Sequence, residues 1–73
     1  MGRLPQVPGE RAVRAFQRAG FRLVRWQGSH AILDDGRVIL SIPCHAGRAL
    51  KKGLLASLIK DAGLTVDEFN KLR

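Results

Sequence analysis

His30 is the side chain of this sequence best suited to chemistry at neutral pH. It follows Gly28 and Ser29 and opens a short apolar segment with strand character. An unperturbed imidazole titrates near pH ~6.5, so it can accept and return protons under physiological conditions. Beside a ribose it could take the 2′-hydroxyl proton, so that this oxygen attacks the adjacent phosphorus without a metal ion. A strand histidine can also be a hydrogen-bonded structural residue, and the residue type leaves both interpretations open.

Three cations could supply the phosphate contacts that such chemistry needs. Arg48, Lys51 and Lys52 lie just before Gly53 and an apolar-periodic segment. If that segment is a helix, its first backbone N–H groups and these side chains would form a phosphate-binding corner. The competing interpretation is a solvated loop. The basic charge of the chain favours the phosphate site.

Two residues near these cations are weaker candidates. His45 could contact a phosphate or a partner, but a polar loop residue near the sheet edge is the simpler interpretation. Cys44 has no cationic cluster fixed close to it by the sequence, so we expect a partly buried thiol rather than a nucleophile. One cysteine and two histidines cannot form a zinc site unless carboxylates join them. We therefore expect no metal and no other cofactor.

The chain is strongly and unevenly basic. Its 73 residues contain 13 Lys and Arg against 6 Asp and Glu, a formal net charge of +7. Residues 1–52 carry ten of the cations and three of the acids, so the whole excess lies there. Such a field favours a polyanionic partner: nucleic acid, an anionic membrane or an acidic protein. No apolar run approaches the roughly 20 residues that span a bilayer, and no signal peptide is evident, so we expect a cytoplasmic protein without a membrane partner.

The elements that must position these residues follow from periodicity and turn signals. Apolar residues at helical spacing alternate with short strand-like runs, and Asp34-Asp35-Gly36 is typical of a hairpin. The sequence predicts one domain over residues 1–73, of the α+β class, in the order α-β-β-β-α with a short C-terminal helix. The two main helices would cover one face of a three-stranded antiparallel sheet. The expected elements are helix 10–19, strand 21–26, strand 30–33, strand 37–42, helix 54–62 and helix 65–72, and the last of these would begin with a capping box at Thr65-Val66-Asp67-Glu68. The side chains expected to be buried between the sheet and the helices are Phe16, Phe21, Leu23, Leu58 and Ile59.

The opposite face of the sheet is expected to be open to solvent or to a partner. By strict alternation, Leu23 would face the helices, while Val24 and Trp26 would form an exposed apolar strip on the open face. The same alternation separates Arg22 from Arg25, so these two would not form one stripe. We assign neither arginine to a site on this basis.

A set of short segments along the chain also resembles a known family. In chain order they are Ala19-Gly20-Phe21, Gly28-Ser29-His30, Pro43 with His45, Lys51-Lys52-Gly53 and Asp61-Ala62-Gly63-Leu64. No one segment is specific, but the ordered set, spread from about Leu4 to Leu72, resembles the HicA-type toxins of bacterial toxin–antitoxin pairs. The resemblance implies a fold like that of double-stranded-RNA-binding domains, in agreement with the predicted order of elements.

The resemblance also implies a function and its residues. HicA-type toxins are ribosome-independent mRNA interferases, neutralised by a cognate HicB-type antitoxin. On that basis His30 is the catalytic residue, Gly28 and Ser29 shape its approach to RNA, and mRNA and the antitoxin are the partners. Two positions depart from the family pattern. Leu54 stands where a hydroxyl residue is usual, which suggests a lost helix cap, and Cys44 stands where a basic residue is common.

Two other functions use the same residues differently. The chain could be a non-catalytic module that binds duplex RNA by shape and phosphate contacts. It could also be an adaptor whose basic surface only docks an acidic protein. If His30→Ala loses RNA cleavage but still binds RNA, the chain is a nuclease and not a non-catalytic RNA-binding module. RNA affinity that falls with rising salt would exclude the adaptor.

Overall fold

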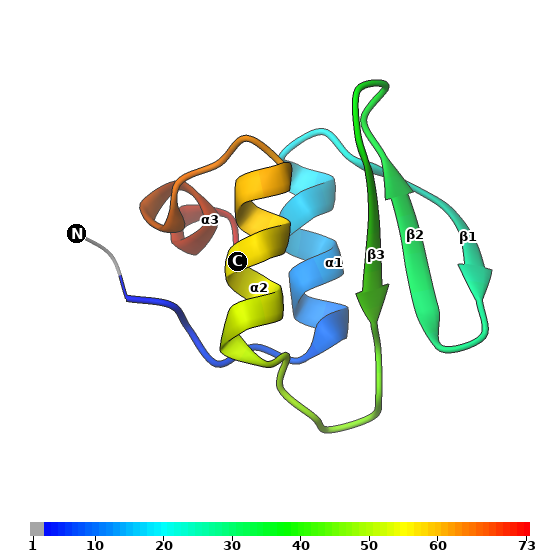
Figure 1. The fold of residues 1–73 in the computed structure, drawn as a ribbon, viewed down its shortest axis with the longest axis horizontal. Helices are drawn as coiled ribbons and strands as arrows, with labels where there is room; N and C mark the ends of the chain where they lie inside the picture. Colours follow the sequence, from blue (N-terminus) through cyan, green and yellow to red (C-terminus); the bar gives the residue numbers. More distant parts are fainter. Residues whose placement is uncertain (1–2) are drawn as a thin grey trace.

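The computed structural model of the chain describes residues 3–73 and has the predicted α-β-β-β-α order, followed by a short third helix. All three helices lie on one side of the sheet (Figure 1). The α+β prediction is therefore confirmed. In chain order the elements are α1 (Gly9–Arg18), β1 (Arg22–Gln27), β2 (His30–Asp34), β3 (Ile39–Pro43), α2 (Lys52–Asp61) and α3 (Val66–Leu72).

The sheet is an antiparallel meander with β2 in the centre. A two-residue turn, Gly28-Ser29, joins β1 to β2, and Gln27 pairs with His30 across it. Gly28 has a φ of 61°, a left-handed conformation that glycine adopts without steric cost. A Cβ atom on Gly28 would have no neighbour within 4 Å. No other part of residues 3–73 lies that close to Gly28, so the glycine is needed here for the turn itself.

The second hairpin is stabilised by its own aspartates. The Asp34 carboxylate accepts a hydrogen bond from the N–H of Gly36, at 2.7 Å. The Asp35 carboxylate accepts from the N–H groups of Arg37 and Val38, at 2.9 and 3.0 Å. Because these two N–H groups are held in the loop, β3 begins at Ile39 and not at Arg37 as predicted.

A β-bulge in β1 changes which face its later residues occupy. Leu23 is opposite Leu33, but Arg25 is opposite Ile32, so Val24 is an extra residue in the strand. Directly paired residues share a face of the sheet. Arg25 therefore lies on the open face with Ile32, and the next residue, Trp26, points toward the helix side.

Two predictions about β1 are corrected by this register. Trp26 is opposite Ala31, whose side chain belongs to the core, so Trp26 is on the helix side and not on the open face. It is nevertheless 53% exposed, because β1 is an edge strand. Arg22 is opposite Asp34 and shares the open face with Arg25, so the two arginines do lie on one face.

The core lies between the helix face of the sheet and the helices. Phe16 of α1 is fully buried and packs against the rings of Phe21 and Phe69, with centroids 5.9 and 5.1 Å away. The predicted core positions of α2, Leu58 and Ile59, are buried as well. Leu23 is only partly buried because its strand is at the edge.

Gly9, the first residue of α1, lies where α1 and β3 approach each other closely. A Cβ atom there would overlap the carbonyl oxygen of Pro43 and lie 2.9 Å from both Cα and Sγ of Cys44. The start of α1 is therefore packed against the end of β3. The preceding segment, residues 3–8, adds an antiparallel bridge between Pro8 and Ala49, and the Leu50 N–H donates to the Val7 carbonyl at 2.8 Å.

The predicted capping box of the last helix is confirmed. The Thr65 hydroxyl accepts from the Glu68 N–H at 3.1 Å, and the Glu68 carboxylate accepts from the Thr65 N–H at 2.8 Å. Within residues 3–73, no helix has the length and apolar character needed to cross a bilayer.

Candidate nucleic-acid interface

His30 is the first residue of β2 and its side chain is exposed on the open face of the sheet. It is paired with Gln27 on one side and with Pro43 on the other. Its imidazole makes no hydrogen bond to any other group of residues 3–73. The interpretation of His30 as a hydrogen-bonded structural residue therefore finds no support in its surroundings, and both ring nitrogens can reach a ligand.

The open face around His30 carries polar and cationic side chains. Arg25 is opposite Ile32, two residues from His30 along β2, which makes Arg25 a diagonal neighbour of the histidine. Diagonal neighbours are about 7–8 Å apart, within reach of a long side chain. Ser41 flanks Ile32 on the other side and is exposed. Ile32 is buried but does not belong to the core cluster, as expected for an apolar residue in the middle of the open face.

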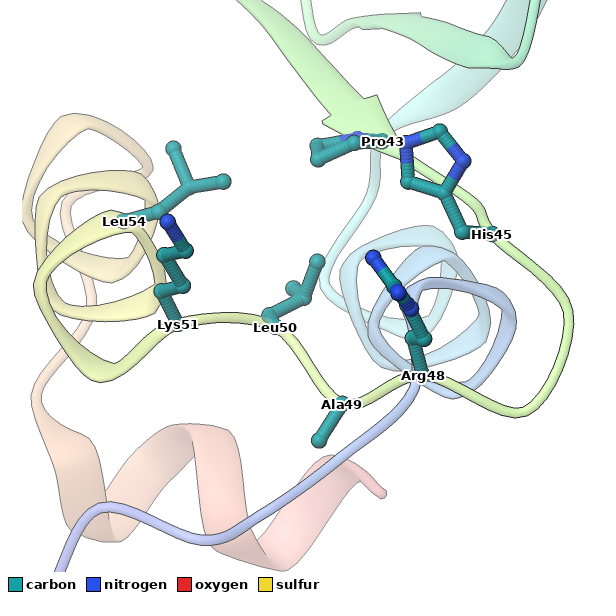
Figure 2. A pocket seen from close by; sticks show the side chains of 7 residues that line it. All are labelled: Pro43, His45, Arg48, Ala49, Leu50, Lys51 and Leu54. Carbon is teal, nitrogen blue, oxygen red and sulfur yellow. The ribbon is translucent and has the colours of Figure 1, made fainter.

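A hollow of about 300 Å³ lies beside the end of β3 and brings together two of the predicted phosphate-binding residues (Figure 2). Arg48 and Lys51 line it, and their side chains extend toward the same opening. His45 lines it as well, with its ring near the Arg48 guanidinium group in the view. Apolar walls come from Pro43, Ala49, Leu50 and Leu54. An anion in this hollow would meet up to three positively charged or hydrogen-bond-donating side chains.

Pro43 connects this hollow with His30. Its ring forms part of the wall of the hollow, and its backbone is paired directly with that of His30. A further contact holds the two segments together, because the Cys44 N–H donates to the Ser29 carbonyl at 2.8 Å. The Gly28-Ser29 turn, His30 and the cationic hollow are thus adjacent along one end of the sheet.

The start of α2 supplies backbone donors next to the hollow. Lys51 is the N-cap residue and offers no side-chain cap, so the first N–H groups of α2 have no partner of that kind. Leu54 lies within the first turn and not at the cap position. The departure at residue 54 therefore does not remove an N-cap, contrary to the expectation from the sequence. Lys52 is exposed at the first helical position and does not line the hollow.

Cys44 does not have the environment of a nucleophile. Burial raises the pKa of its thiol above the ordinary value, and the carboxylate of Glu10 adds to the shift. A raised pKa keeps the thiol protonated at neutral pH. Its Sγ lies 3.5 Å from the Ile42 carbonyl oxygen, and the side chain is partly buried, as expected.

Two residues near the site were not selected from the sequence. Arg25 was missed because alternation assumes an unbroken strand, and nothing in the local sequence marks the bulge. His45 was regarded as a loop residue, although its spacing of three from Arg48 could have indicated a shared turn. The Arg48 N–H does donate to the His45 carbonyl at 2.9 Å, which closes that turn. No three His, Cys, Asp or Glu side chains gather as a potential metal site within residues 3–73.

Comparison with the models of known protein families gives a match. The model of a family described as the HicA toxin of bacterial toxin–antitoxin systems matches residues 9–64. The matched segment contains α1, the whole sheet, the cationic hollow and α2, and it leaves out α3. No curated protein matches the chain. Because the match covers well over half of the sequence, and includes both His30 and the residues of the hollow, the chain belongs to the HicA family of bacterial toxin–antitoxin toxins.

Proposed function

We propose that this toxin is a ribosome-independent endoribonuclease that cleaves mRNA through His30. The observation that carries the proposal is the position of this imidazole. It is exposed, free of hydrogen bonds within the described chain, and next to a hollow lined by Arg48 and Lys51. An imidazole beside a cationic anion site is the arrangement that phosphodiester cleavage by acid–base catalysis requires.

The proposed reaction is an internal transfer within the RNA. His30 takes the proton of a ribose 2′-hydroxyl, and the 2′-oxygen bonds to the adjacent phosphorus. The bond from phosphorus to the 5′-oxygen of the next nucleotide breaks, and that oxygen receives a proton from solvent or from the imidazolium. The products are a 2′,3′-cyclic phosphate and a 5′-hydroxyl end, so the reaction needs no metal or cofactor.

Cationic groups on either side of His30 would bind the substrate. Arg48 and Lys51 in the hollow, with the first N–H groups of α2, would bind a phosphate adjacent to the reacting one. Arg25 on the open face would approach the reacting phosphate from the other side. Lys52 would contribute to the general attraction of the backbone, and Gly28 and Ser29 would limit how closely RNA approaches along the turn.

The main alternative is a module that binds duplex RNA without cleaving it. One feature favours it: among residues 3–73, no second acid–base side chain is hydrogen-bonded to His30. The same cationic surface would then bind phosphates only. The two functions differ in a single measurement, which is cleavage by a chain that still binds RNA.

The decisive experiment compares His30→Ala with the parent chain on labelled mRNA, with and without a chelator. We expect cleavage to fall by about 10²–10⁴-fold, the usual contribution of a general acid or base, with RNA affinity retained. His45→Ala is a matched control, because it removes the other histidine, and it should lose about tenfold through weaker phosphate binding. An unchanged rate in His30→Ala would refute the mechanism, and loss of parent activity on chelation would refute its metal independence.

We further propose that a HicB-type antitoxin neutralises the toxin by blocking access to His30. Val24 and Trp26 on the edge strand are 49% and 53% exposed, which is unusual for large apolar residues and suits a protein contact. Trp26 is the one tryptophan of the chain, so its fluorescence reports on this edge alone. Antitoxin binding should shift the Trp26 emission to shorter wavelength and stop cleavage at the same stoichiometry. Inhibition without any change in Trp26 emission would place the contact elsewhere.

A further inference from the structure

We propose that four arginines on the helix side of the molecule form a second binding site for RNA phosphates. Arg11, Arg14 and Arg18 of α1, together with Arg73, line a hollow of about 270 Å³. The residues that line the cationic hollow beside the end of β3 are all different from these four. The inference rests on the proposed function, because it concerns how the same toxin holds its RNA.

The site is built by one helix face and the end of another helix. Residues 11, 14 and 18 have the spacing that places side chains on one stripe of a helix, and all three are exposed. The Arg18 guanidinium group donates to the Leu72 carbonyl at 2.7 Å, which ties α1 to the end of α3. Arg73 follows directly, and its Nε donates to the Asn70 side chain at 3.0 Å. One tertiary hydrogen bond, from Arg18, and one local hydrogen bond, from Arg73, therefore hold two of the four cations in place.

The positive charge of this cluster is not neutralised within residues 3–73. The one ion pair within residues 3–73 joins Arg37 and Asp35, which lie in the β2–β3 hairpin and not in the cluster. Glu10, the acid of α1, makes no ion pair with the cluster. Four guanidinium groups around one hollow repel each other, and a bound anion would relieve this repulsion. The planar guanidinium group binds phosphate or carboxylate oxygens through two parallel N–H bonds, so this donor set fits an oxyanion.

Surface composition favours RNA over an acidic protein as the ligand. Protein interfaces are organised around apolar and aromatic anchors. The large exposed apolar side chains of residues 3–73 are Val24, Trp26, Ile39 and Leu54, and none lines the arginine hollow. A purely cationic surface of this kind matches a phosphate backbone, whose recognition is electrostatic and independent of sequence.

The arginine hollow and His30 lie in different layers of the fold. α1 covers one face of the sheet (Figure 1). The strand register places the His30 side chain on the other face. The longest dimension of the molecule is 33 Å. With the rise of one strand of B-form DNA, about 3.4 Å per nucleotide, roughly ten nucleotides span that length. A long RNA can therefore reach both sites, whereas an RNA of a few nucleotides can occupy only one.

The test uses the full chain carrying His30→Ala, so that RNA is bound but not cut, and measures fluorescence anisotropy at several salt concentrations. Arg11→Gln with Arg14→Gln removes two charged side chains that make no hydrogen bond to any group of residues 3–73, and Gln retains helix propensity. Lys60→Gln with Lys71→Gln is the matched control, because these exposed lysines line neither hollow. The probes are RNAs of about 20 and about 4 nucleotides, since binding sites of this kind span roughly 4–16.

We expect the arginine pair to lower affinity for the long RNA about tenfold and to reduce the slope of log affinity against log salt by roughly 1.4, or about 0.7 per lost phosphate contact. The arginine pair should change affinity for the short RNA by about twofold or less. The lysine pair should change affinity for either RNA by about twofold or less. Equal effects of the two pairs on the long RNA would overturn the proposal. So would normal RNA affinity with loss of antitoxin binding, which would assign the hollow to an acidic protein segment. If the His30→Ala chain bound neither RNA, the proposed function would fail as well.

Discussion

The two faces of the sheet differ in the burial and polarity of their side chains. On the helix face Ala31, Leu33, Leu40 and Ile42 are fully or almost fully buried. On the open face the exposed polar residues His30 and Ser41 alternate with them along the same two strands. Because successive side chains of a strand point to opposite sides, neighbouring residues can serve different purposes. The helix face stabilises the fold, and the open face remains free to bind a ligand without loss of stability.

The strongest test of this division compares one residue from each face. Leu33→Ala removes a fully buried side chain and should lower the free energy of unfolding by about 2–5 kcal/mol, through lost transfer energy and the cavity left behind. Ser41→Ala, on the exposed face of the adjacent strand, should change it by less than about 0.5 kcal/mol. Chemical denaturation at neutral pH measures both. Similar losses in the two variants would mean that the open face also contributes to stability.

A smaller effect distinguishes positions within the open face. Arg25→Gln should reduce RNA cleavage about tenfold, because a charged contact to phosphate next to His30 is lost. Arg22→Gln removes the same charge from the same face and strand, but its partner Asp34 lies four residues from His30, so the loss should be about threefold or less. Initial rates with a labelled RNA at fixed salt test this. A larger effect at Arg22 than at Arg25 would contradict the register-based position of the substrate.

The smallest effect concerns the hairpin at the far end of the sheet from His30. Hydrogen bonds from the N–H groups of Val38 and Arg37 lower the pKa of Asp35 below its ordinary value of 3.8. Because the folded state has the lower pKa, the ionised carboxylate favours folding above pH 3.8, and this contribution is lost as the pH falls through the folded-state pKa. Asp35→Asn should therefore unfold at a lower temperature than the parent at neutral pH.

The difference between Asp35→Asn and the parent should close in acid. Thermal unfolding followed by circular dichroism between pH ~7 and ~2.5 would show this. Asp61→Asn is a suitable control, since the Asp61 side chain makes no hydrogen bond or ion pair within residues 3–73. RNA cleavage at neutral pH should be unaffected by Asp35→Asn. A melting difference that persisted unchanged at the lowest pH would show that the charge of Asp35 is not its source.

Features that depend on nearby residues could be predicted from the sequence. The Asp34-Asp35-Gly36 hairpin and the Thr65–Glu68 capping box form from groups within a few residues of each other, and both were predicted. The same holds for the position of His30 at the start of a strand. Their geometry is set by local hydrogen bonds and by backbone preferences, which the order of residues encodes directly.

The sequence by itself determined the order of elements, the turns, the core-forming periodicity and the candidate histidine. Tertiary structure alone decided that Arg25 shares a face with His30, that Trp26 does not, and that Arg73 joins three arginines of α1. It also decided that Gly9 must lack a side chain, because the end of β3 packs against it. The reason is the same in each case. These relations depend on which segment lies opposite or beside another, and a bulge or a helix–helix contact fixes that only once the chain is packed.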